Sequence, residues 1–307
     1  MPSKMKLTNR VASGFALASV KPGAQWIDLP KPDQKDFEWL QKKFHLHPVI
    51  LEELKSPSAR SRVEAYDHYL YLIYYFPVYD PKEEASRRAE IDFIITKDFV
   101  VTVHYEDLEA LTYLKDRTAE SSLRLTYDIV ESLFNFQERQ LRHIAEKTEK
   151  VGAELFKNNE KDVLQKISRL KRDVSEYRII VRHQGPILKS LLVYGLKFWG
   201  EPARVYLEDL VGDHLKIVNR VEDYREAVGD FEDTNNQLMN LKINEVMKTF
   251  TTLSFLTFPF MLFAALFSMN TNDTPIIKLP GAFWIILGIM AVAMATLFMY
   301  FKKKGWL

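Results

Sequence analysis

Side chains that could line a path for ions recur along one face of an apolar segment near the C-terminus. Their spacing alternates between four and three residues, so an α-helix would place them on one stripe. The stripe comprises Asn240, Asn244, Met247, Thr251, Ser254, Phe258, Met261 and Ala265. A water-filled path beside this face is one explanation, because lipid contact does not require amides and hydroxyls. The alternative is that the hydroxyls bond their own backbone or a neighbouring helix.

Oxygen atoms are the metal-ligating groups that the composition favours. The chain has no cysteine, which excludes thiolate sites and leaves hard, oxygen-liganded cations open. Residues 203–235 contain nine acidic and four basic residues, and a surface with such an excess of negative charge raises the local concentration of cations. A solvated helix face would explain the same excess of charge.

The sequence lacks the motifs of enzyme chemistry. It contains neither a phosphate-binding glycine loop nor a nucleophile elbow, and its seven histidines show no zinc-protease spacing. His45 and His47 are two residues apart, which favours a surface or capping role. Lys and Arg total 42 against 41 for Asp and Glu, and this balance argues against a nucleic-acid partner. We therefore expect neither an enzyme nor a nucleic-acid-binding protein.

Two uncharged apolar runs, residues 249–267 and 281–301, predict membrane-spanning helices. Each approaches the ~20 residues that an α-helix needs to cross the hydrocarbon layer. Lys248 precedes the first run and three lysines at 302–304 follow the second, whereas the connection between the runs carries one acid and one lysine. The excess of positive charge predicts a multi-pass protein of the cell membrane, in contact with lipid, with both termini in the cytosol.

A long helix should lead into the first membrane run. Apolar or small residues alternate at four and three positions from Ala203 to Leu238, interrupted by His214 and Asn235. This 3.5-residue period predicts packing along a seam, either against another subunit or within the same chain. Upstream, residues 121–157 and 161–189 read as a helical hairpin that turns near residues 158–159.

The sequence pattern of the first third of the chain predicts a sheet with helices. Runs rich in aromatic and β-branched residues at 69–78, 91–96 and 99–104 predict strands, and residues 35–44 and 48–55 predict short helices. The expected fold is an α+β cytosolic domain followed by a long helical stalk and two C-terminal transmembrane helices. The expected cytosolic divisions are the sheet domain (1–120), the helical hairpin (121–200) and the stalk helix (201–248). They are followed by the first membrane helix (249–270), the outer loop (271–282), the second membrane helix (283–301) and the basic tail (302–307).

The whole chain resembles the CorA family of magnesium and cobalt channels. The segment from His47 to Val78 is similar to the family's HP-x-x-LED and R-x-K-x-E-x-Y patterns, and Pro259 and the final KKKGWL also match. The family hallmark Gly-Met-Asn ends the first membrane helix, and Ser268, Met269 and Asn270 occupy that place here. The resemblance implies a funnel-shaped homopentamer that carries Mg²⁺, with Co²⁺ as a further substrate.

Particular roles are implied by the same resemblance. Ser268, Met269 and Asn270 would form the selectivity filter, where the Asn270 carbonyl accepts from the water of a hydrated Mg²⁺. The matching pore positions are Asp233 at an acidic entrance ring, Asn244, and an apolar constriction of Phe250, Phe258 and Met261. Glu53 and Asp209 match the acids that bind regulatory Mg²⁺ between neighbouring subunits and close the pore.

The chain departs from the family at three places. Ser268 replaces glycine, the outer loop lacks a Met-Pro-Glu-Leu element, and Glu53 stands where aspartate is usual. Two alternatives therefore stay open. One is a transporter of Zn²⁺, Co²⁺ or Ni²⁺ on the same architecture, and the other is a membrane-anchored scaffold or Mg²⁺ sensor that conducts nothing.

Overall fold

A computed structural model describes residues 23–112, 114, 119–157, 160–269 and 280–305. The chain divides into two compact units. The first contains Met1–Gly152 and Lys166–Val228, and the second contains Ala153–Gln165 and Gly229–Leu307. We describe each unit by itself.

The first unit is built on a five-stranded mixed sheet in the order β1-β5-β4-β3-β2. The strands are β1 (Gln25–Pro30), β2 (Arg62–Ala65), β3 (Leu70–Asp80), β4 (Ala85–Ile95) and β5 (Phe99–His104). β1 runs parallel to β5, and the other neighbours are antiparallel. The three predicted strands are confirmed as β3, β4 and β5. β4 begins earlier than expected because its polar residues continue the hairpin with β3, where Asp80 pairs with Ala85.

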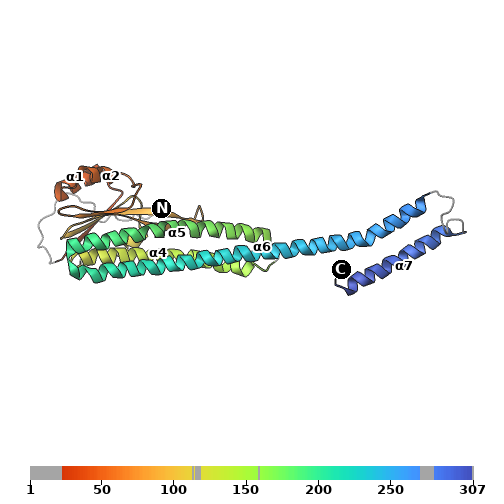
Figure 1. Ribbon diagram of the computed structural model, residues 1–307. Helices are drawn as coiled ribbons and strands as arrows, with labels where there is room; N and C mark the ends of the chain where they lie inside the picture. Colours follow the sequence, from red (N-terminus) through yellow and green to blue (C-terminus); the bar gives the residue numbers. More distant parts are fainter. Residues whose placement is uncertain (1–22, 113, 115–118, 158–159, 270–279, 306–307) are drawn as a thin grey trace, which may run out of the picture. The chain divides into compact units, whose positions relative to one another are not determined.

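Helices cover both faces of this sheet (Figure 1). α1 (Gln34–Phe44) and α2 (Pro48–Glu53) lie on one face, where Leu40 and Ile50 are fully buried together with Tyr71 and Ile73 of the sheet. The Nδ1 of His47 accepts from the Val49 N–H at 3.3 Å and caps α2, which confirms the capping role that its position favoured.

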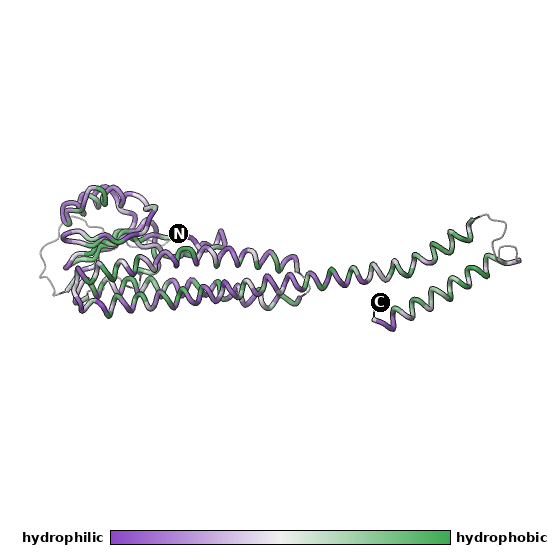
Figure 2. The backbone as a smooth tube through the Cα atoms, in the orientation of Figure 1, coloured by the Kyte–Doolittle hydropathy of each residue, from purple (hydrophilic) through white to green (hydrophobic). Residues whose placement is uncertain are grey.

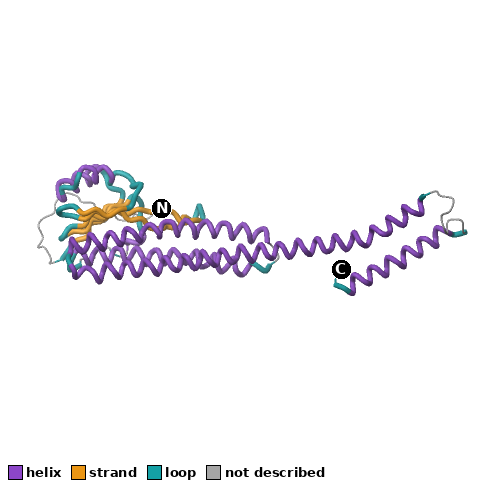
Figure 3. The backbone as a smooth tube through the Cα atoms, in the orientation of Figure 1, coloured by secondary structure: helices purple, strands orange, loops and turns teal. Residues whose placement is uncertain are grey.

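Long helices cover the other face (Figures 1 and 3). The short α3 (Glu109–Thr112) precedes α4 (Ser122–Glu154) and α5 (Glu160–Trp199), a single 3₁₀ turn follows at Glu201–Ala203, and α6 runs from Arg204 to Ser268. α4 and α5 confirm the two predicted hairpin helices, and the expected turn at 158–159 lies outside the described residues.

The seam of α6 is buried within the chain between Ala203 and Val228. Leu207, Leu210 and Val221 are at most 2% exposed. Contacts with α4 and α5 explain this burial, since a methyl group on Gly195 of α5 would meet Leu207 at 2.7 Å. The 3.5-residue period over this stretch therefore arises from packing against helices of the same chain.

The second unit contains the two apolar helices. α6 continues without a break through the predicted boundary at residue 248, and α7 spans Ala282–Lys303. Both are long and apolar enough to cross a membrane (Figure 2). The Lys248 ammonium donates to the carbonyl of Gly305, so the start of the apolar part of α6 meets the end of α7. The two C-terminal helices of the predicted fold class are confirmed.

Candidate functional site

The predicted ion-path stripe on α6 is largely uncovered in a single chain. Phe250, Phe258 and Met261 are each about two-thirds exposed, at 65%, 67% and 68%, although all three are apolar. Asp233, Asn240, Asn244, Met247 and Ser254 are also exposed, and Thr251 is half-buried. On a helix apolar enough to cross a membrane, exposed aromatic and thioether side chains contact either lipid or another copy of the helix.

α7 leaves this stripe free because α6 buries its opposite side. Thr252 is fully buried and Phe260 is 7% exposed, and Phe301 at the end of α7 is buried as well. At about 100° per residue, Ser254 and Met261 lie roughly 200° and 180° around the helix from Thr252. The stripe and the buried side of the helix therefore face in opposite directions.

The hydroxyl groups of this segment bond their own helix. Ser254 Oγ donates to the carbonyl of Phe250 at 2.9 Å, and Thr252 Oγ1 donates to that of Lys248 at 2.8 Å. This is the local arrangement that was the alternative explanation for hydroxyls in an apolar run. The hydroxyl oxygen of Ser254 keeps its lone pairs, and because the residue is exposed it can accept from water.

The predicted filter begins where α6 ends. Ser268 is the last helical residue, and its Oγ donates to the carbonyl of Ala265 at 2.9 Å. Met269 follows with 56% exposure. Asn270 lies outside the described residues.

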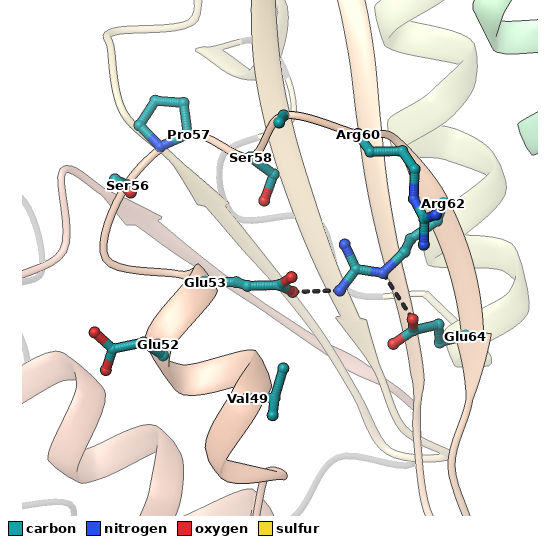
Figure 4. A pocket seen from close by; sticks show the side chains of 10 residues that line it. Val49, Glu52, Glu53, Ser56, Pro57, Ser58, Arg60, Arg62 and Glu64 are labelled. Carbon is teal, nitrogen blue, oxygen red and sulfur yellow. Dashed lines mark hydrogen bonds and ion pairs between the residues drawn. The ribbon is translucent and has the colours of Figure 1, made fainter.

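Glu53, at the last position of α2, lines a surface pocket of about 660 Å³ (Figure 4). Its carboxylate forms an ion pair with the guanidinium of Arg62 on β2. Nε of the same guanidinium contacts Glu64 at 2.7 Å. Figure 4 shows Arg62 between the two acids, with Glu52 directed away from it.

Two further acids, Glu90 and Asp92 of β4, lie on the same face of the sheet as Arg62. Burial raises the pKa of Asp92 well above its usual value, and the nearby Glu90 raises it further. Burial also raises the pKa of Glu90, which accepts from the Ser58 N–H at 2.8 Å. Tyr105 donates to Asp92 at 3.0 Å. Burial and the neighbouring Glu90 therefore favour the neutral carboxyl of Asp92, against the hydrogen bond from Tyr105.

Asp209 is exposed near the start of α6 and accepts from the hydroxyl of Tyr127 at 2.7 Å. That hydrogen bond, together with burial, raises the pKa of Tyr127. Glu53 and Asp209 belong to elements on opposite faces of the sheet (Figure 1), so one chain does not bring them together. Among the described residues no group of three or more His, Asp or Glu side chains could hold a metal ion. A site made from these two acids requires two chains.

The model of the CorA-like Mg²⁺ transporter protein family matches residues 22–303. The chain belongs to this family. It is 23% identical over 291 residues to the cobalt/magnesium transport protein CorA of Thermotoga maritima, covering 92% of this chain and 83% of that protein.

Solved structures agree on the fold. The complete structure of the CorA magnesium transporter from Methanocaldococcus jannaschii matches with a TM-score of 0.80 and 21% identity, covering 95% of both chains. Full-length CmaX matches with a TM-score of 0.71 and 18% identity, covering 94% of this chain and 91% of that one. The family resemblance drawn from the sequence motifs is confirmed.

The sequence motifs of the CorA-like family included Arg62 and Glu64 without indicating what they contact. The alternation of a strand places both side chains on one face of β2, and this signal was available. Their pairing with Glu53 depends on how the end of α2 lies over the sheet. Tyr127 gave no signal, because it reaches Asp209 from a position 82 residues away.

Proposed function

We propose that the chain is the subunit of a homopentameric channel that passes Mg²⁺, and also Co²⁺, through the cell membrane. The observation that carries this proposal is the uncovered stripe of α6 opposite α7. Several copies of α6 around an axis would cover it and enclose a path for water, which one or two helices cannot do. The name of the Thermotoga maritima relative, a cobalt/magnesium transport protein, supports the choice of ions.

The chemistry of the stripe suits a hydrated divalent cation. Mg²⁺ gives up its inner water reluctantly, so amide and hydroxyl oxygens can recognise the ion through that water. Asn240, Asn244 and Thr251 would supply such oxygens on the cytosolic side, and Asn270 would supply them at the outer end. Phe250, Phe258 and Met261 would form a constriction that impedes ions when it loses water.

Glu53 and Asp209 would form a regulatory Mg²⁺ site between neighbouring subunits. Both acids offer hard oxygen ligands, and both are accessible to another chain. Glu53 and Glu64 share one guanidinium, that of Arg62, so their cluster keeps a net negative charge. Without a bound cation, this cluster and Asp209 would repel one another across the subunit interface. Mg²⁺ would bridge them and favour the closed assembly, so that a high cytosolic concentration reduces flux.

Two features support an orientation with both termini in the cytosol. Lys248 and the basic C-terminal segment meet at one end of the helix pair. Lys302 and Lys303 lie in the last turn of α7, so both helices carry their positive charge at that end. Positive residues are retained on the cytosolic side of membrane proteins.

A single-cysteine experiment tests the pore, because the chain contains no cysteine of its own. Met261→Cys should conduct Mg²⁺ in proteoliposomes loaded with a Mg²⁺-sensitive dye. A permanently charged thiol reagent should then block the flux, since it adds bulk and charge at the constriction. The matched control is Val292→Cys, whose parent side chain is 69% exposed on α7 and should face lipid.

Two outcomes would contradict the proposal. Full flux through Met261→Cys after complete modification by the reagent would remove the stripe from the pore. No Mg²⁺ flux through the parent chain would leave a transporter of Zn²⁺, Co²⁺ or Ni²⁺, or a membrane-anchored sensor or scaffold, as the function.

A further inference from the structure

Arg62 is placed to act on the regulatory site that we propose at Glu53, and the following inference rests on that proposal. Its guanidinium contacts two acids through different nitrogens. Nη2 pairs with Glu53 at the end of α2, and Nε contacts Glu64 on the same strand at 2.7 Å. The Arg62 side chain is only 14% exposed, whereas Glu53 and Glu64 remain about one-third exposed.

The surroundings keep the guanidinium charged and in place. Burial alone would lower the pKa of Arg62, but the hydrogen bonds to Glu53 and Glu64 outweigh it and raise the pKa above its usual value. The ring of Tyr71 lies 5.6 Å from the guanidinium carbon. The hydroxyl of Tyr66 donates to Glu64 at 2.9 Å and fixes that acid beside Arg62.

We propose that Arg62 is a tethered cation that competes with the divalent ion for Glu53 and thereby sets the Mg²⁺ concentration at which the regulatory site fills. Glu53 exchanges its contact with Nη2 for the metal when Mg²⁺ binds. Arg62 retains Glu64 through Nε, so the exchange leaves no buried charge without a partner. Glu64 is the acid that holds Arg62 when Glu53 is occupied.

The geometry permits this exchange. The two contacts use separate nitrogens of a rigid fork, so one can break while the other stays. The pocket beside Glu53 is open and has a volume of about 660 Å³, which admits a hydrated ion and a carboxylate from a second chain. A metal at Glu53 binds only when Arg62 has released this acid, and the apparent dissociation constant is the intrinsic one divided by the released fraction.

The proposal predicts opposite effects for two neighbouring substitutions. Arg62→Gln removes the competitor and should lower the Mg²⁺ concentration of half-saturation by about fivefold to tenfold, the range for a partly exposed ion pair that contributes about 1 kcal/mol or slightly more. Glu64→Gln removes the second acceptor of Arg62, commits the guanidinium to Glu53, and should raise the half-saturating concentration. Tyr66 can still donate to the amide oxygen of the new side chain.

The experiment measures protection of the full chain from a protease in detergent across a titration of MgCl₂. The proposal would be supported if half-maximal protection occurs at a lower Mg²⁺ concentration in Arg62→Gln and at a higher one in Glu64→Gln than in the parent. Damage to the fold would instead weaken protection in both variants, at all Mg²⁺ concentrations. Unchanged midpoints, or midpoints that move in the same direction, would overturn it.

The double variant Glu53→Gln with Asp209→Asn separates this inference from the proposed function. Loss of protection in that variant while Arg62→Gln matches the parent would overturn the role of Arg62 and leave the regulatory site standing. If the parent shows no Mg²⁺-dependent protection, the regulatory part of the proposed function fails. If the parent shows no Mg²⁺-dependent protection but Arg62→Gln does, the result would still support competition between Arg62 and Mg²⁺ for Glu53. If neither the parent nor Arg62→Gln shows such protection, the competition is overturned.

Discussion

Replacement of His214 with leucine should remove most of the acid sensitivity that this residue gives to the helix packing of the first unit. His214 occupies the buried seam of α6 and is 4% exposed. Its neighbours include the ring of Phe134 on α4, at 6.4 Å between centroids, and Gly185 on α5. Burial lowers the pKa of His214 to about 4, and no charged neighbour contributes to this shift.

The size of the effect follows from the two protonation equilibria. In the unfolded chain the histidine has a pKa of ~6.5, so the unfolded state binds a proton more readily than the folded state does. Stability is therefore complete above pH ~6.5 and decreases as the pH falls toward the folded value. Between pH 7.5 and pH 5.0 the calculated loss is about 2 kcal/mol.

Urea unfolding of the full chain in detergent, followed by circular dichroism at both pH values, measures this loss. The difference in the free energy of unfolding between pH 7.5 and pH 5.0 should be about 2 kcal/mol smaller in His214→Leu than in the parent. His183→Leu, which changes an exposed histidine on α5, is the control and should keep the parental difference. An undiminished difference in His214→Leu would refute the assignment of a buried neutral imidazole.

Two buried aspartates should respond differently to neutralisation, and the filter should respond to truncation. Asp173→Asn should reduce the free energy of unfolding by about 2 to 4 kcal/mol, because this fully buried acid accepts from Ser86, His143 and Lys147. Burial raises its pKa, but the hydrogen bonds from His143 and Lys147 dominate and lower it, so the stabilisation is present above pH ~3.9 and is lost in more acidic solution. Asp92→Asn should cost less than about 1 kcal/mol, since burial already favours the neutral carboxyl there, and equal losses in the same urea titration would contradict this contrast. Asn270→Ala should lower Mg²⁺ uptake by proteoliposomes, and unchanged uptake would remove Asn270 from the filter.

Properties that depend on neighbouring residues were predictable from the sequence. The uncharged runs at 249–267 and 281–301 identified the two apolar helices, because insertion depends on the composition of one segment. Aromatic and β-branched runs identified β3, β4 and β5 in the same way. β1 and β2 were missed, since both are short and lack a continuous apolar run. β1 also depends on a partner 74 residues away, as Gln25 pairs with Phe99.

The identity of each contact partner was decided only by the tertiary structure. The 3.5-residue period of α6 predicted a buried seam but not what covers it, and the structure shows that residues of the same chain cover Leu207 and His214. The sequence motifs place Glu53, Arg62 and Glu64 at separate positions, and the position of α2 over β2 joins them into one cluster. Periodicity records that a side chain is buried, whereas pairing depends on chain segments that are distant in sequence and meet only when the domain folds.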